Sequence, residues 1–214
     1  FISLVLDEYR KSLARDKRHL VRQYRAVDIA RKVVGAGSVG TRAWIVVLEG
    51  SSSNDVLVLQ IKEAQRSVLE HYAGKAPFLQ HGQRVVEGQR AMQTASDIFL
   101  GWTRAVGLDG KVHDFYVRQL WDGKGSFDLN AIDAEGLTAL GKICGWTLAH
   151  AHARTGNRFA IAGYLGKSDT FDRAIVSFAE EYAKQNERDF QEFMEAYRSG
   201  MLCEKMDAQS RKLL

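Results

Sequence analysis

The fold of this chain is decided by residues 35–62, which read GAGSVGTRAWIVVLEGSSSNDVLVLQIK. After the glycine-rich turn come a β-branched and aromatic run at 43–48, a polar turn at 50–54 and a second apolar run at 56–61. Apolar runs that alternate with turns rich in Gly, Ser and Asn are typical of antiparallel strands. Together with residues 30–34, which lead into the glycines, the stretch predicts an antiparallel meander of three strands.

The sequence on either side of this meander predicts further strands and several helices. The expected helices are residues 2–25, 64–72, 83–96, 134–153 and 169–200, and the expected additional strands are 98–102 and 114–121. The predicted fold is therefore α+β: a five-stranded antiparallel sheet with a helix, like the small lobe of a protein kinase, followed by a helical region. Its expected parts are an N-terminal helix (1–25), the sheet lobe (26–122), the helical region (123–200) and a tail (201–214).

Composition excludes several classes of protein. Of the 214 residues, 45% are hydrophobic and 26% charged, which is typical of a globular chain with its own core. The two cysteines, Cys144 and Cys203, cannot make a disulfide scaffold, and this favours a reducing, cytoplasmic location. No apolar run approaches the ~20 residues of a membrane helix, so we expect no membrane partner. Because the chain starts at Phe1 within a predicted helix, we expect a piece of a longer protein.

The net charge of +4 is unevenly distributed, because basic residues gather in the first predicted helix. Such a cluster is compatible with nucleic-acid binding. However, Asp7, Glu8 and Asp16 are interspersed with the basic residues, and no aromatic side chains alternate with them as in a single-strand binding platform. We therefore interpret the cluster as a solvated helix face and keep nucleic-acid binding as the weaker alternative.

The sharpest motif is G-x-G-x-x-G, formed by Gly35, Gly37 and Gly40 with Ser38 at the tip of the turn. In a dinucleotide-binding unit these glycines would open a helix, but here strand-forming residues follow. A glycine-rich hairpin between antiparallel strands is typical of the kinase loop that covers nucleotide phosphates. The structural alternative is an ordinary hairpin with a bulge.

Residues further along the chain meet the next requirements of a kinase-like nucleotide site. Lys62 ends an apolar strand, as does the kinase lysine that binds phosphates. Glu87 lies in the helix before the fourth strand and is expected to hold Lys62, with Glu70 as the substitute. Backbone groups near Gln119 and Leu120, after the fifth strand, are expected to contact the base. The alternatives are a lysine that extends to solvent and a solvated glutamate.

The catalytic part of a kinase is not recognisable, so the catalytic residues are unknown. A kinase catalytic loop reads His-Arg-Asp followed, after four residues, by Asn. Here His150 and Asn157 occupy the first and last positions, but His152 replaces the aspartate, and no Asp-Phe-Gly follows. Two histidines two positions apart on a helix also make a poor zinc pair, so no metal site is predicted. We expect Cys144 and Trp146 to lie in the core.

Several longer stretches resemble an uncharacterised bacterial family, domain of unknown function 2252. They are residues 33–42, 59–64, 81–90, 96–102, 116–120, 149–154 and 162–166. The resemblance extends from about Tyr24 to Asp189, while Trp121, Gly123 and Asn157 depart from the family pattern. It implies an upstream segment with Gly-Asp-x-His-x-x-Asn and Asp-Phe-Asp elements similar to the catalytic and metal-binding loops of aminoglycoside-phosphotransferase-like kinases.

The resemblance therefore implies a nucleotide partner, with ATP and Mg²⁺ as cofactors and an acceptor that the family does not identify. We expect the nucleotide-binding part of a kinase-like phosphotransferase, inactive without the upstream segment. The alternative is a non-catalytic, kinase-like binding or regulatory module.

Overall fold

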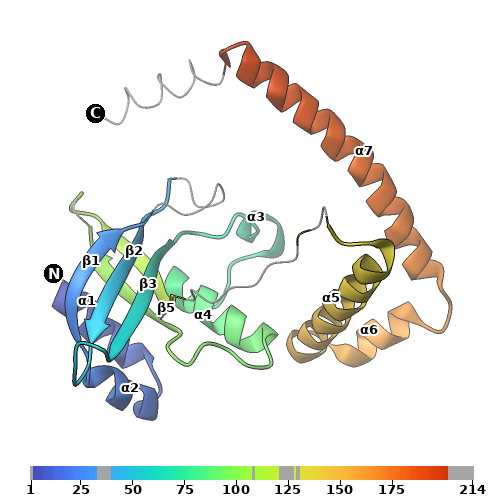
Figure 1. Cartoon of the computed structure of the whole chain (residues 1–214). Coiled ribbons are helices and arrows are strands. Elements are labelled where there is room, and N and C mark those ends of the chain that lie inside the picture. The colour runs from blue at the N-terminus through green and yellow to red at the C-terminus, as the bar shows by residue number, and fades with distance from the viewer. Residues whose placement is uncertain (1, 33–39, 108, 121–127, 129–130, 202–214) are drawn as a thin grey trace. The chain divides into compact units, whose positions relative to one another are not determined.

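The computed structural model of the chain describes residues 2–32, 40–107, 109–120, 128 and 131–201 (Figure 1). These residues form two compact units, Phe1–Asn157 and Arg158–Leu214. The first unit holds α1 (Ile2–Ser12), α2 (Arg15–Arg22), β1 (Arg25–Arg31), β2 (Ala43–Glu49), β3 (Val56–Ala64), α3 (Glu70–Ala73), α4 (His81–Met92), β4 (Gly101–Val106), β5 (Val112–Gln119) and α5 (Ala134–Thr155). The second holds α6 (Arg158–Leu165) and α7 (Thr170–Arg198).

The five strands form one antiparallel sheet in the order β1-β2-β3-β5-β4. The predicted five-stranded antiparallel sheet is thereby confirmed, and so is the position of the helical elements after it. The hairpin turn before β5 contains Gly110 at a φ of +71°, a left-handed conformation that favours glycine. In Figure 1, α4 lies beside the sheet. It contacts β3, which precedes it in the chain, and β4 and β5, which follow it.

The prediction of a single helix at residues 2–25 is wrong. The segment forms two helices and then enters β1 at Arg25. Arg18 of α2 donates to the carbonyl oxygens of Arg10 (2.9 Å), Lys11 (2.9 Å) and Leu13 (3.1 Å) at the end of α1. The Arg10 carbonyl also accepts the Leu13 N–H at 3.2 Å, and the guanidinium adds donors to these carbonyls at the helix end, which stabilises the break. At least this part of the basic cluster therefore has a structural role.

One face of the sheet packs against α1 and α2 and forms the apolar core. Tyr9 of α1 is fully buried, and its hydroxyl donates to the carbonyl oxygen of Phe99 at 2.6 Å. Thr103 of β4, also buried, donates to the carbonyl oxygen of Val5 at 3.1 Å. The strands contribute to this core the buried residues Val46, Leu48, Leu57, Leu59, Ile61, Phe115 and Val117. We call this side the core face.

Helix α4 packs on the opposite face of the sheet. A Cβ atom at Gly82 would lie only 2.1 Å from the carbonyl oxygen of Phe115, so glycine permits the close approach of α4 to β5. The side chain of Gln80 caps the helix by accepting from the Gln83 N–H at 2.7 Å. Asp114 of β5 accepts from the His81 N–H at 2.8 Å, which fixes the start of α4 over the sheet.

Helix α5 belongs to the same compact unit as the sheet. Arg154 in its last turn donates to the carbonyl oxygen of Ala91 (3.3 Å) and to the Thr94 hydroxyl (3.0 Å), just where α4 ends. Of the described α5 residues, Ala151 alone is buried. Cys144 and Trp146 are exposed, so their predicted core positions are wrong.

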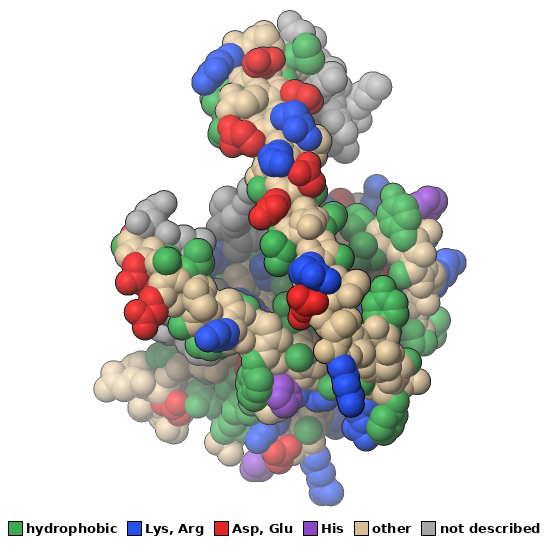
Figure 2. Space-filling view, turned by 90° about the vertical axis from the view of Figure 1, so that its right-hand side faces the viewer, with side chains coloured by type: hydrophobic (Ala, Val, Ile, Leu, Met, Phe, Trp, Pro, Cys, Tyr) green, Lys and Arg blue, Asp and Glu red, His purple; other side chains and the backbone are tan. Residues whose placement is uncertain are grey.

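The second unit contains α6, which the sequence analysis did not predict, and α7, which it did. Asp169 precedes α7 and Gly200 follows its end at a φ of +77°, so both predicted helix ends are confirmed. Hydrophobic side chains are exposed on the helices (green in Figure 2), and in α7 they include Phe171, Ile175, Phe178, Tyr182, Phe190, Phe193 and Tyr197.

Candidate functional site

The glycine-rich turn is only partly within the described residues. Gly35, Gly37 and Ser38 lie outside them, so their predicted role in holding phosphates stays a prediction. Gly40 has a φ of +82°, and a Cβ atom there would meet nothing within 4 Å. Its conformation, rather than crowding, is therefore what favours glycine two residues before Arg42.

Lys62 lies on the face of the sheet opposite the core. It is half-buried near the end of β3, in register with Ala43 of β2 and Tyr116 of β5. Paired residues of antiparallel strands share a face, and successive residues alternate between faces. The register thus defines what we call the Lys62 face: Ala43, Ile45, Val47, Val58, Gln60, Lys62, Trp102, Tyr116 and Arg118.

The Lys62 face combines a polar row with an apolar patch. Gln60 is 3% exposed, and its Oε1 accepts from Arg118 Nε at 3.3 Å. The phenol of Tyr116 can donate a hydrogen bond, and burial raises its pKa further above its ordinary value. Beside this row, the half-buried side chains of Ile45, Val47 and Val58 form an apolar surface. The face offers cationic groups and donors next to a surface on which an aromatic ring can pack.

Both glutamates suggested as partners of Lys62 form ion pairs with arginines of their own segment. Glu87 Oε1 lies 3.2 Å from Arg90 NH1, one helical turn away in α4. Glu70 Oε2 lies 3.0 Å from Arg66 Nε, and its side chain is 10% exposed. Arg90 also donates to the carbonyl oxygen of Leu100, which links α4 to the start of β4. The pairing of Lys62 with either glutamate stays a prediction.

The backbone N–H groups predicted to contact a base already have partners. The Gln119 N–H donates to Asp97 Oδ2 at 2.6 Å, and the Leu120 N–H donates to the carbonyl oxygen of Val58 at 2.8 Å. A base at this position would obtain no N–H from these two residues unless one of the bonds were exchanged. Side chains or carbonyl groups would therefore have to recognise it.

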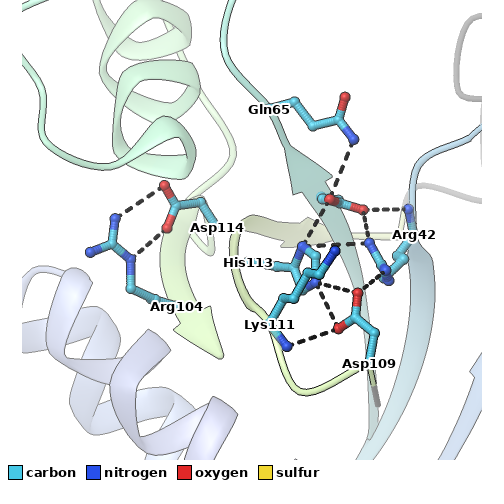
Figure 3. A network of polar contacts seen from close by, with 8 residues as sticks. Arg42, Gln65, Arg104, Asp109, Lys111, His113 and Asp114 are labelled. Atoms are coloured by element: carbon cyan, nitrogen blue, oxygen red, sulfur yellow. Dashed lines mark hydrogen bonds and ion pairs between the residues drawn. The ribbon is translucent and has the colours of Figure 1, made fainter. Parts of the chain in front are cut away.

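A network of charged residues that the sequence analysis missed lies at the end of the sheet, next to the glycine-rich turn (Figure 3). Glu63, with a side chain 5% exposed, accepts from the Arg42 N–H (3.0 Å) and from Arg42 NH1 (3.0 Å). Arg42 NH2 reaches Asp109 at 2.7 Å. His113 lies between the two carboxylates, with Nδ1 3.2 Å from Glu63 and Nε2 3.0 Å from Asp109.

The network holds its carboxylates in the charged form. Burial by itself would raise the pKa of Glu63, but the hydrogen bonds from the Arg42 N–H and guanidinium outweigh it and lower that pKa. The hydrogen bond from His113, aided by the Lys111 N–H, lowers the pKa of Asp109. The network therefore joins the turn between β4 and β5 to Arg42, at the point where the chain leaves the glycine-rich turn.

Two features of the sequence pointed to Arg42 and Glu63, although not to the whole network. Glu63 directly follows Lys62, so the two side chains must point to opposite faces of β3. Arg42 and Glu63 also lie within stretches that carry the family resemblance. The register that brings Asp109 and His113 to them depends on the pairing of β3 with β5, which the sequence does not specify.

A cavity of about 890 Å³ lies beside the end of β5. Its walls come from the end of α4, the segment that follows it, residues 118–120 and the second half of α5. Gln119 and Leu120 line this cavity, whereas Lys62 and Gly40 do not.

Comparison with protein families identifies the chain. The family described as an uncharacterized protein conserved in bacteria (DUF2252) matches residues 2–196. The chain belongs to this family. The DUF2252 match covers the sheet, the Arg42 network and the cavity. Neither curated proteins nor solved structures yielded a match.

Two further properties of this DUF2252 chain concern metals and membranes. Within the described ranges, no three His, Cys, Asp or Glu side chains are grouped so that they could hold a metal ion. The described helices also include none with the length and hydropathy needed to cross a membrane. The first observation gives Mg²⁺ no cage made of protein ligands alone among the described residues, and a Mg²⁺ ion held mainly by nucleotide phosphates and water needs none.

Proposed function

We propose that this chain is the nucleotide-binding part of a kinase-like phosphotransferase of unknown acceptor. Lys62 would bind the phosphates, together with the glycine-rich turn that ends at Gly40. The half-buried apolar patch of Ile45, Val47 and Val58 would pack against the sugar or the base. ATP is the proposed nucleotide. Because the described residues do not group as metal ligands, we assign no Mg²⁺ ligand and no catalytic step to them.

The observation that supports this proposal most is the composition of the Lys62 face. Lys62 is half-buried near the end of an inner strand, which is the position from which a kinase-type lysine binds nucleotide phosphates. On this face it lies beside the buried Gln60 and the protonated phenol of Tyr116.

Three contacts favour the alternative, a non-catalytic module that keeps the fold without using nucleotide. Glu87 forms its ion pair with Arg90, and the N–H groups of Gln119 and Leu120 are bound within the protein. A module of this kind would use the sheet unit as a scaffold for partner binding.

Calorimetric titration of the intact protein with ATP and AMP separates the two functions. If Lys62 binds the β- or γ-phosphate, Lys62→Ala weakens ATP binding about tenfold or more, as expected for loss of a charge-assisted hydrogen bond, and leaves AMP binding unchanged. The matched control is Lys142→Ala, because Lys142 is an exposed residue of α5.

Equal ATP affinity in wild type and Lys62→Ala contradicts the proposed role of Lys62. Absence of ATP binding in the wild type contradicts the nucleotide function as a whole and favours the non-catalytic module. Circular dichroism of each variant checks that the sheet unit remains folded.

A further inference from the structure

The cavity beside the end of β5 has walls that are already fixed by internal contacts. Arg154 is held by the α4 carbonyls and by Thr94, as described above. Asp97 accepts from the Phe99 N–H at 2.8 Å and from the Gln119 N–H at 2.6 Å. Since both charged groups are engaged, the cavity has an ordered lining before anything binds.

Two other polar side chains of the lining are available to a ligand. Arg118 uses Nε to donate to Gln60, and the contacts of the described residues leave its two terminal nitrogens without an acceptor. His150 stacks near Trp146, with ring centroids 4.2 Å apart, and its ring nitrogens have no hydrogen-bond partner among the described residues. Arg118 is half-buried, so its unused donors lie where water is restricted.

The charge and shape of the lining select the chemistry of a ligand. Two arginines face a single aspartate, whose oxygens are already bound by N–H groups. An anion is therefore favoured over a cation. The apolar part of the wall comes from Met92, Ile98, Leu120 and Trp146. A volume of about 890 Å³ lies within the range of small-molecule sites.

We propose that this cavity binds a small organic anion, whose carboxylate or phosphate group is held by the terminal nitrogens of Arg118. His150 donates a second hydrogen bond, and the apolar part of the anion packs against Trp146 and Met92. Lys62 and Gly40 do not line the cavity, whereas Arg118 of the Lys62 face and the predicted base contacts Gln119 and Leu120 do. The anion site is therefore separate from the residues proposed to bind the phosphates, but it shares its edge with the place predicted for the base.

The test is an NMR titration of the intact protein with three probes: benzoate, phenyl phosphate and neutral benzyl alcohol. We expect at least one acid to shift the indole signal of Trp146, assigned with Trp146→Phe, at concentrations where benzyl alcohol has no effect. The acid that binds more tightly shows whether the site prefers a carboxylate or a phosphate group. Arg118→Gln is expected to weaken binding of that acid about tenfold or more. Arg15→Gln removes an exposed arginine of α2 and is the matched control.

Several results would overturn the proposal. They are binding of neither acid at millimolar concentration, equal binding of benzyl alcohol, and an Arg118→Gln variant that binds as the wild type does. Displacement of the bound acid by inorganic triphosphate, which carries no base, would overturn the separation of the anion site from the residues proposed to bind the phosphates. Should Arg118→Gln fail to fold, Arg118→Lys and His150→Ala take its place. The proposal is supported if His150→Ala binds the acid more weakly and Arg118→Lys keeps part of the binding. Unchanged binding of the acid in both variants overturns it.

Discussion

The two faces of the sheet are built from the same strands but differ in packing. On the core face, residues such as Val46 and Leu59 are fully buried against α1 and α2. On the Lys62 face, their neighbours Val47 and Val58 remain half-buried, and Lys62 itself lies beyond them. Because side chains alternate along a strand, adjacent residues contribute separately to stability and to binding. The less complete packing of the Lys62 face is the reason why we propose the nucleotide site there.

The largest expected effect tests this division with two adjacent residues. Leu59→Ala removes a fully buried side chain and is expected to lower the free energy of unfolding by about 2–5 kcal/mol. Val58→Ala, on the Lys62 face, is expected to cost about 1 kcal/mol or less, because its side chain is only half-buried. Urea unfolding followed by circular dichroism measures both. Similar losses in the two variants would contradict the difference between the faces.

A second pair of variants tests how closely α4 covers part of the Lys62 face. Gly82→Ala places a Cβ atom 2.1 Å from the Phe115 carbonyl oxygen and is expected to destabilise by about 1–3 kcal/mol. Gly88→Ala in the same helix meets nothing within 4 Å and is expected to stabilise by up to about 1 kcal/mol. Thermal unfolding of both variants provides the measurement. A stabilising Gly82→Ala would show that α4 does not approach the sheet this closely.

The smallest expected effect is the pH dependence of stability that comes from two carboxylates at one end of the sheet, Glu63 and Asp114. The pKa values of Glu63 and Asp114 lie below their ordinary values of 4.5 and 3.8 in the folded protein. A carboxylate of this kind contributes stability that is complete above its ordinary pKa and is lost as the pH falls through the lower folded pKa. We therefore expect the free energy of unfolding to decrease as the pH is lowered below about 4.

The double variant Glu63→Gln, Asp114→Asn is expected to show a smaller decrease. Urea unfolding at a series of pH values measures it. An unchanged slope would show that these carboxylates are not stabilised as described.

Much of the sheet could be predicted from the sequence, because local pattern determines it. The meander around residues 43–61 follows from alternating apolar runs and polar turns, and α7 from its helical spacing and end signals. The break between α1 and α2 could not be predicted, since it depends on Arg18 binding carbonyl groups that only the folded helices bring together. The same holds for Trp146, whose apolar character suggested a core position although its side chain is exposed in the folded chain.

The candidate site was predictable in part for a related reason. Lys62 stands out as a charged residue at the end of an apolar strand, which is a local signal. The Arg42 network and the cavity involve residues up to 71 positions apart, and they depend on strand register and on the packing of α4 and α5. The bonds of the Gln119 and Leu120 N–H groups are of the same non-local kind.

The most direct test of the central claim is a methyl NMR titration of the intact protein with ATP. The account predicts shifts for the methyl groups of Ile45, Val47 and Val58 on the Lys62 face, with those of Val46 and Leu59 on the core face unchanged. It also predicts that Lys62→Ala reduces these shifts at equal ATP concentration. Shifts on the core face, or no shift on either face at millimolar ATP, would contradict it.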